Sequence, residues 1–158
     1  MNATSEKAGT TTSATLRCQF CFTWNKIDVT RASDRPRCGK CSKPMLLDRP
    51  VMLDDESFAR TIGGSEVPVI VDFYADWCGP CKMMAPAVDQ LAASYAGRAI
   101  VAKVNTDLSQ AATQPFGIRG IPTTIVFSGG KETARQSGAM PYAMLASMLD
   151  RALSGVSS

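Results

Sequence analysis

The sequence predicts an α/β fold, in which helices flank a central mixed β-sheet, preceded by a small cysteine-rich module. From about residue 51 onward, apolar strand-like runs alternate with helix-like stretches, which is the pattern of strand–helix–strand units. Within residues 16–48, by contrast, four of the six cysteines gather without a periodic apolar pattern. The 158 residues suffice for one domain and one small additional module.

The elements expected in the first half of the domain follow from its apolar runs and their flanking residues. They are a strand at 51–53, a helix from about 54 to 62, a strand at 67–75, a helix at 78–95 and a strand at 99–104. Residues 67–75 are almost continuously β-branched or aromatic, which is typical of a strand buried on both faces. The acids at 54–56 favour a helix start, and Gly63 and Gly64 favour its end. Pro86 is expected to kink the longer helix.

The second half of the domain adds two strands and a closing helix. The expected elements are a short helix at 109–114 capped by Asp107, strands at 123–127 and 131–137, and an amphipathic helix at 141–153. Gly129 and Gly130 predict a hairpin turn, and the polar character of residues 131–137 predicts an edge strand. The unit 67–104 predicts a parallel crossover, so the sheet combines parallel and antiparallel pairs.

Composition and charge restrict the class of protein. Hydrophobic residues make up 45% and charged residues 20%, which is typical of a globular protein. No run approaches the roughly 18 apolar residues of a membrane helix, and no secretory signal is visible, so we expect a cytoplasmic protein without a membrane partner. Residues 1–15 are rich in Ser, Thr and Ala and are expected to form a flexible tail. The expected domains are thus 1–15 (tail), 16–48 (module) and 51–155 (main domain).

The net charge of +3 is unevenly distributed along the chain. Residues 1–50 contain nine Lys/Arg against four Asp/Glu, so the N-terminal part is mildly basic. A basic surface can suit nucleic acid, but it is more often a solvated face, and we expect no nucleic-acid partner. Nothing in the sequence indicates an obligate oligomer, and a monomer is expected.

All six cysteines fall in Cys-x-x-Cys pairs, and the chain contains no histidine. In a reducing compartment, such pairs bind metal or perform redox chemistry rather than crosslink the fold. The absence of histidine excludes a Cys-His nucleophile, a histidine general base and any histidine-ligated zinc.

The pair at Cys78 and Cys81 stands where a buried strand is expected to end and a helix to begin. A helix N-terminus stabilises a thiolate, which is the reactive form of cysteine. Cys78 is then the nucleophile, and Cys81, one turn deeper, is the resolving thiol that attacks the mixed disulfide. Gly79 permits a tight turn, and Pro80 suits the first helical turn. A zinc site or an inert buried pair is the alternative, but zinc needs about four ligands, and this domain offers neither a histidine nor a third cysteine near the pair.

The stretch Val71-Asp-Phe-Tyr-Ala-Asp-Trp-Cys-Gly-Pro-Cys-Lys82 closely resembles the thioredoxin family, and the resemblance covers roughly residues 51–153. It implies the thioredoxin fold and reduction of protein disulfides by a Cys78/Cys81 dithiol–disulfide cycle. It also implies re-reduction by thioredoxin reductase with electrons from NADPH, and no bound organic cofactor.

The resemblance implies roles for further residues at matching positions. Asp72 matches the buried aspartate that takes the proton of the resolving cysteine, and Lys103 matches the lysine beside it. The residues expected to bind substrate are Trp77, Gly79, Pro80, Gly120, Ile121, Pro122 and Gly138. Of these, Pro122 matches a cis-proline, and the Ile121 backbone would hydrogen-bond an extended substrate segment.

Three positions depart from the common family pattern. Tyr74 replaces a frequent tryptophan, while Thr106 and Ser137 replace hydrophobic residues of the substrate groove. These changes predict a more polar docking surface and leave the reaction type unchanged.

Cys18, Cys21, Cys38 and Cys41 form two Cys-x-x-Cys pairs separated by sixteen residues, a strong signature of one zinc ion bound by four thiolates. A segment this short has too little apolar surface to fold unaided, so the metal would supply folding energy. The alternative is a second redox pair or a redox-responsive zinc site, in which oxidation releases the metal.

A zinc module ahead of a thioredoxin domain resembles the thioredoxin 2 group of bacterial thioredoxins, which is cytosolic. The alternative function is a zinc-ribbon binding module or holdase that uses the thioredoxin domain as a scaffold. The module's aromatic residues, Phe20, Phe22 and Trp24, could stack on nucleic-acid bases, but we expect them to cover the module's small core.

Overall fold

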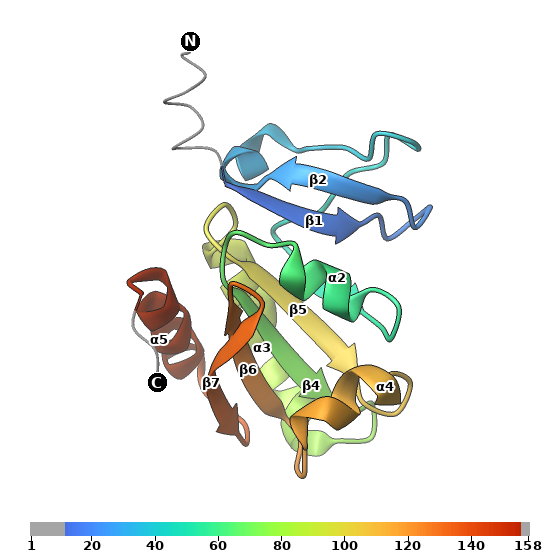
Figure 1. Cartoon of the computed structure of the whole chain (residues 1–158). Helices are drawn as coiled ribbons and strands as arrows, with labels where there is room; N and C mark the ends of the chain where they lie inside the picture. Colours follow the sequence, from blue (N-terminus) through green and yellow to red (C-terminus); the bar gives the residue numbers. More distant parts are fainter. Residues whose placement is uncertain (1–11, 156–158) are drawn as a thin grey trace.

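The computed structural model describes residues 12–155 and contains a five-stranded sheet beside a two-stranded sheet (Figure 1). The strands are β1 (Ser13–Arg17), β2 (Trp24–Asp28), β3 (Val51–Leu53), β4 (Val69–Tyr74), β5 (Ile100–Asn105), β6 (Thr123–Ser128) and β7 (Lys131–Ser137). The helices are α2 (Phe58–Gly63), α3 (Gly79–Ser94), α4 (Gln110–Thr113) and α5 (Tyr142–Leu153), with 3-10 turns η1 (Val29–Asp34) and η2 (Gln114–Phe116). Residues 1–11, most of the predicted tail, lie outside the described part.

The main sheet has the strand order β3-β5-β4-β6-β7 and is mixed, as predicted. β5 pairs in parallel with both β3 and β4, whereas β6 pairs antiparallel with β4 and β7. Gly129 and Gly130 have φ of 60° and 82° in the β6–β7 turn, a conformation that glycine adopts without steric cost. The polar strand β7 lies at the sheet edge and is largely exposed, as its sequence predicted.

The strand β4 is buried on both faces and forms the centre of the core. Val69, Val71 and Phe73 belong to one apolar cluster, which includes Phe58 and Ile62 of α2. Ile70, pointing the opposite way, belongs to a second cluster built by α3 and α5. Burying each such side chain contributes about 1.5–3 kcal/mol, which is why an almost continuously apolar strand is stable only between two helical layers.

One helix begins later than predicted. α2 begins at Phe58 rather than near residue 54, because the Asp54 carboxylate closes a turn before it. Asp54 Oδ1 accepts hydrogen bonds from the backbone amides of Glu56 and Ser57 at 3.1 and 2.9 Å. α3 matches the predicted range closely and contains Pro86, as expected.

The cysteine-rich module packs directly on the main domain. β1 begins at Ser13, within the segment 1–15 that was predicted as a tail. Its Ser13 amide donates to Glu66 Oε1 at 2.7 Å, and at its other end Arg17 pairs with Asp54 at 2.7 Å. Gly64 allows the close approach, because a Cβ there would lie 2.9 Å from the Thr15 Cβ. The two segments therefore meet along the length of β1.

The core of the module is continuous with that of the domain. Ala14, Leu16, Ile27 and Val29 are buried in the same cluster as the apolar residues of β3 and β4. The expectation that the aromatic residues cover this core was wrong for two of them: Phe20 and Phe22 are 51% and 63% exposed. Both belong to the loop that carries the first cysteine pair, whose sulfur atoms face inward and leave these rings outside. Trp24 is half-buried, with the Arg60 guanidinium 4.4 Å from its ring.

None of the helices between residues 12 and 155 is long and apolar enough to span a membrane.

Candidate functional site

The Cys78–Cys81 pair lies at the point where β4 has ended and α3 begins. Cys78 occupies the N-cap position with an extended backbone, and the backbone amide of Cys81 donates to its sulfur at 3.2 Å. The two cysteines form a disulfide, and each is only 4% exposed. The amides of the first helical turn favour negative charge on the Cys78 sulfur, as predicted from its place before a helix.

A second loop faces the pair and contains the predicted cis peptide bond between Ile121 and Pro122. The Ile121 carbonyl oxygen lies 3.7 Å from Cys78 Sγ. The Gly138 amide, just after β7, donates to the Pro122 carbonyl at 2.8 Å and ties this loop to the sheet edge. The sheet thus brings residues more than forty positions apart to one edge of the protein.

An open cleft of about 440 Å³ lies between these two loops. Its lining includes five of the predicted substrate-binding residues: Trp77, Gly79, Pro80, Gly120 and Ile121. Cys78 lines the same cleft, so its sulfur is the part of the pair that a bound molecule meets. Thr106 is also part of the wall, whereas Ser137, the other polar replacement predicted for the groove, does not line the cleft.

Trp77 is 70% exposed, yet its ring is held in place by a hydrogen bond. The indole Nε1 donates to Asp107 Oδ2 at 2.8 Å. The prediction that Asp107 caps a short helix was wrong, since Ser109 occupies the N-cap position of α4. The carboxylate is drawn instead to an indole donor that β4 and β5 bring beside it.

Asp72 is 4% exposed, and neither of its carboxyl oxygens has a hydrogen-bond partner. Burial raises the pKa of Asp72 from 3.8 to about 6, against the opposing effect of the Lys103 charge. Lys103 lies opposite Asp72 in the β4–β5 register, but no ion pair joins them within the described residues. The Lys103 ammonium lies 4.6 Å from the Tyr74 ring centroid instead, a cation–π contact.

The raised pKa of Asp72 makes a prediction for stability against pH. Because the folded state binds the proton more tightly than the unfolded chain, this group stabilises the fold most below pH 3.8, and the contribution falls as pH rises through 6. At about 1.36 kcal/mol per pKa unit, the loss amounts to about 3 kcal/mol. We expect Asp72→Asn to be more stable than the parent by up to about that amount at pH 7.5 and by much less at pH 4. Urea unfolding at both pH values measures the difference, and an equal gain at the two would contradict it.

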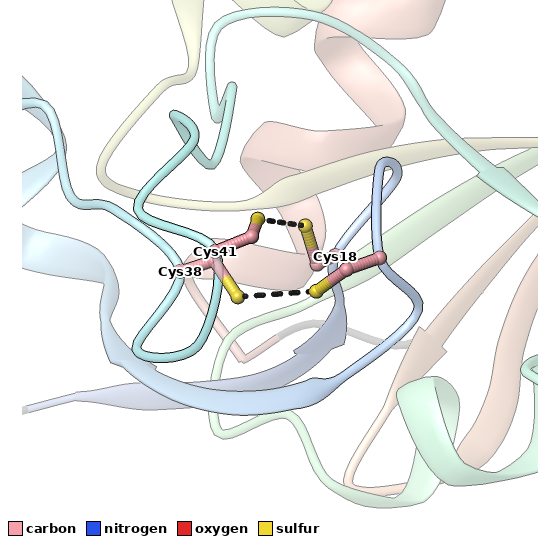
Figure 2. A group of neighbouring side chains, drawn as sticks. Cys18, Cys38 and Cys41 are labelled. Atoms are coloured by element: carbon pink, nitrogen blue, oxygen red, sulfur yellow. Dashed lines mark hydrogen bonds between the residues drawn. The ribbon is translucent and has the colours of Figure 1, made fainter.

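The four cysteines of the module also meet (Figure 2). Cys18, Cys21, Cys38 and Cys41 place their sulfur atoms within 4.8 Å of one another, with Cys18–Cys41 and Cys21–Cys38 contacts of 3.6 Å. Around a tetrahedral ion with metal–sulfur bonds of about 2.3 Å, sulfur atoms lie about 3.8 Å apart. The cluster is therefore suitable for one metal ion.

The two cysteine loops have the same backbone design. In each loop, the amide of the residue after the second cysteine donates to the carbonyl of the first: Phe22 to Cys18 and Ser42 to Cys38, both at 3.0 Å. Phe22 and Ser42 also share a left-handed backbone, with φ of 64° and 65°. Such repeated turns aim backbone amides at the sulfur atoms, as with Phe20 N to Cys18 Sγ at 3.4 Å.

Asn25 is a supporting residue that sequence reasoning missed. Its side-chain amide donates to Cys38 Sγ at 3.4 Å, and its Oδ1 accepts from the Gly39 amide at 2.9 Å. The Cys41 amide, the Asn25 side chain and the Lys40 amide together lower the pKa of Cys38 to about 6, which favours the thiolate that binds a metal. No spacing signal reveals Asn25, because it reaches the second cysteine loop from β2.

Known proteins similar to this chain share its main domain. Residues 49–151 match the family model of thioredoxin. Thioredoxin C-3 of Corynebacterium nephridii is 35% identical over 136 residues, covering 86% of this chain and 93% of that protein. The chloroplastic M-type thioredoxin of Zea mays is 40% identical over 125 residues, covering 79% of this chain and 75% of that protein.

A solved structure supports the fold independently. A mutant thioredoxin from Halobacterium salinarum NRC-1 superposes with a TM-score of 0.62 at 31% identity, covering 68% of this chain and 93% of that one. The family match spans the main sheet and the Cys-Gly-Pro-Cys segment at the start of α3. The chain belongs to the thioredoxin family of protein-disulfide reductases, with Cys78 and Cys81 as its redox-active pair.

Proposed function

We propose that this protein is a cytoplasmic, zinc-bearing reductase of the thioredoxin 2 type, which thioredoxin reductase returns to the dithiol state. The main support for the reductase role is the position of the Cys78 sulfur. It lies at the N-terminus of α3, beside an open cleft, with the backbone carbonyl oxygen of Ile121 at 3.7 Å. That arrangement lets a substrate disulfide approach the nucleophile along an extended segment.

The proposed reaction consists of two thiol–disulfide exchanges. The Cys78 thiolate attacks one sulfur of the substrate disulfide, forming a mixed disulfide and releasing the other substrate sulfur as a thiolate. Cys81 then transfers its proton to the Asp72 carboxylate and attacks the Cys78 sulfur, which releases the second substrate sulfur. Two electrons pass to the substrate, and its two thiolates take up two protons from the dithiol and solvent. The protein is left with the Cys78–Cys81 disulfide.

Substrate binding is assigned to the walls of the cleft. Trp77 would provide a flat apolar surface, because Asp107 holds its ring at the cleft rim. Ile121, next to the cis-proline Pro122, would offer backbone hydrogen bonds to an extended substrate segment. Gly120 and Gly138 present no side chain on either side of that segment. Lys103 is assigned a positioning role, since its charge opposes the rise in the Asp72 pKa.

The proposed base role of Asp72 predicts a pH-dependent rate. The carboxylate accepts a proton only above its pKa of about 6, so the resolving step should accelerate as pH rises through that value. We expect Asp72→Asn to lower single-turnover insulin reduction at pH 7.5 by roughly 100-fold and to flatten the acid limb of the pH profile. Stopped-flow measurements between about pH 5 and 8 test this; an unchanged acid limb in the variant would remove Asp72 from the mechanism.

The metal site is assigned to one structural zinc ion held by Cys18, Cys21, Cys38 and Cys41. Thiolate ligands and sulfur spacings close to a tetrahedron favour zinc over magnesium or calcium, which prefer oxygen. When bound, the ion would supply folding energy to the module rather than take part in the exchange. A redox-responsive role, with oxidation of the thiolates and release of the metal, is the second possibility for this site.

The match to Thioredoxin C-3 extends beyond the main domain into the cysteine-rich module, which supports a module shared with this relative. A match of 136 residues within a chain of 158 has to begin by residue 23, so it reaches back across the second cysteine loop. The proposed partners are thioredoxin reductase and disulfide-containing proteins, and the protein is proposed to act as a monomer.

The test of this function is insulin reduction in the presence of NADPH and thioredoxin reductase. We expect catalytic turnover that stops when either the reductase or this protein is omitted. If the fully reduced protein does not reduce insulin even once, the reductase role is contradicted. If it reduces insulin once but is not recycled by thioredoxin reductase, only the assigned electron donor is contradicted.

The alternative function, a nucleic-acid-binding zinc ribbon, is favoured by one observation. Phe20 and Phe22 are exposed on the first cysteine loop, with Lys43 and Arg17 near their rings. This alternative would be supported if the protein bound single-stranded nucleic acid in a salt-dependent way and if Phe20→Ala and Phe22→Ala removed the binding. Deleting residues 1–48 would not be a clean test, because the module shares the core of the domain. No binding at low salt would exclude this alternative.

A further inference from the structure

A second open cleft, of about 460 Å³, lies where the first cysteine loop meets the main domain. Phe22 of that loop forms one wall, and Leu108, from the segment after β5, lines the same cleft. Met52, Tyr74 and Asn105 contribute from the ends of the neighbouring strands. The cleft therefore exists only because the module is docked against this edge of the sheet.

The second cleft lies next to the active-site cleft. Both are built at the carboxyl ends of β4 and β5, and different residues of the short segment 105–108 line each of them. Thr106 lines the active-site cleft, while Asn105 and Leu108 line the second one. Between them, Asp107 holds the Trp77 ring. A polypeptide that passes from the active site over segment 105–108 would therefore reach the second cleft.

The rim of the second cleft is unusually apolar for an exposed surface. Phe22 is 63% exposed, Leu108 is 78% exposed and Met52 is 42% exposed. Single exposed apolar side chains are ordinary, but three around one cleft beside a reactive cysteine pair mark a binding surface.

Two carboxylates, Asp76 and Asp107, adjoin this cleft without lining it, next to its lining residues Asn105 and Leu108. Arg17 is neutralised by Asp54 at 2.7 Å and Glu56 at 3.6 Å, and the Lys103 ammonium lies over the Tyr74 ring. The two carboxylates accept one neutral donor each: Asp76 Oδ2 from Asn105 at 3.4 Å, and Asp107 Oδ2 from Trp77 at 2.8 Å. Neither has a cationic partner among the described residues, so a bound cation would find unused acceptor oxygens there.

We propose that this second cleft binds the substrate protein's chain beyond its disulfide, as an extended segment with an apolar side chain next to a lysine or arginine. The inference rests on the proposed function and adds a substrate class to it. The apolar side chain packs between Phe22 and Leu108, and the cation faces Asp76 and Asp107. The cysteine-rich module thereby becomes part of the substrate site.

Three synthetic peptides test the proposal, each with the same intramolecular disulfide. One is extended by Leu-Lys-Leu-Lys, one by Leu-Glu-Leu-Glu and one by Ser-Gly-Ser-Gly. The readout is the half-saturation concentration for single-turnover reduction by pre-reduced protein. We expect it to be about tenfold lower for the Leu-Lys peptide than for the Ser-Gly peptide, the size expected from burying one apolar side chain. For the Leu-Glu peptide, repulsion by Asp76 and Asp107 should cancel this gain and leave the value equal to that of the Ser-Gly peptide.

Two variants and a matched control locate the effect. Phe22→Asn removes the ring at a left-handed position that asparagine tolerates, and Leu108→Ser removes the facing side chain. Phe20→Asn is the control, because Phe20 is similarly exposed on the same loop but lines a different cavity, with Leu46. The first two should lose the Leu-Lys advantage while reducing the Ser-Gly peptide normally and retaining the metal; the control should keep the advantage.

The outcomes separate this proposal from the reductase role. Equal half-saturation concentrations for all three peptides would overturn the proposed role of the second cleft. An equal loss of the Leu-Lys advantage in the Phe20 and Phe22 variants would do the same, and both results leave the reductase role intact. If the protein dimerises at higher concentration and Phe22→Asn abolishes the dimer, the second cleft binds a second copy of this chain instead of substrate. That result would also overturn the proposal. Failure to reduce any peptide would contradict the reductase function and this inference with it.

Discussion

Replacing Cys78 with serine should abolish disulfide reduction, with a loss on the order of 1000-fold or more in insulin turnover. A serine hydroxyl is not ionised near neutral pH, and neither the first-turn amides of α3 nor the Cys81 amide at 3.2 Å can make it a comparable nucleophile. The fold should be unaffected, since the substitution is nearly isosteric. Insulin precipitation with NADPH and thioredoxin reductase measures the loss, and activity equal to that of the parent would refute the assignment of the nucleophile.

The matched control is Cys81→Ser, which distinguishes the two sulfur atoms. This variant keeps the nucleophile but lacks the thiol that resolves the mixed disulfide. We expect one substrate chain to remain covalently attached to Cys78, visible by mass spectrometry without reductant and released by dithiothreitol. Trapping by Cys78→Ser instead of Cys81→Ser would reverse the two roles.

The second large effect is expected at the metal site. Cys18→Ser should reduce zinc from about one ion per chain to almost none, because three thiolates and no histidine cannot complete a structural site. Structural zinc supplies roughly 10–16 kcal/mol to isolated fingers, and here we expect unfolding to become easier by roughly 3 kcal/mol or more. The loss should extend to the main domain, because Ala14 and Leu16 of β1 belong to its core.

Metal analysis and thermal unfolding check this expectation, with Cys81→Ser as the control for removal of any cysteine. Cys81→Ser should retain zinc and the melting temperature of the reduced parent. Cys18→Ser should still reduce small disulfides below its melting temperature, because Cys78 and Cys81 do not depend on the metal. Equal zinc in Cys18→Ser and the parent would show that this cluster is not the metal site.

Much of the fold follows from local sequence. The almost continuously apolar stretch around Val71 predicted a central strand, and the polar stretch after Gly130 predicted an edge strand; both predictions are confirmed. The residue pattern of a strand predicts whether one or both of its faces are buried, because apolar side chains are stable only where another layer covers them. The chemistry of Cys-x-x-Cys at a helix start is equally local, since spacing alone places both sulfur atoms on one turn.

Other features depend on contacts between distant segments. The role of Asp107 could not be predicted, because a carboxylate after a strand serves as a helix cap or as an acceptor for an indole according to what the neighbouring strand brings near. The same applies to Asn25, which reaches Cys38 from another strand. The Lys103 ammonium also lies over Tyr74 rather than in an ion pair with Asp72, although the strand register places Lys103 opposite Asp72.

The sequence by itself determined the α/β class, the reactive pair at Cys78 and Cys81, and the four cysteines of the module, since each depends on periodicity or spacing within short segments. Only the tertiary structure decided where the module lies. Its docking through β1 places Phe22 and Leu108 around one cleft at the carboxyl ends of the sheet. The docking joins segments far apart in the chain, and its free energy comes from burying the shared core rather than from any local pattern.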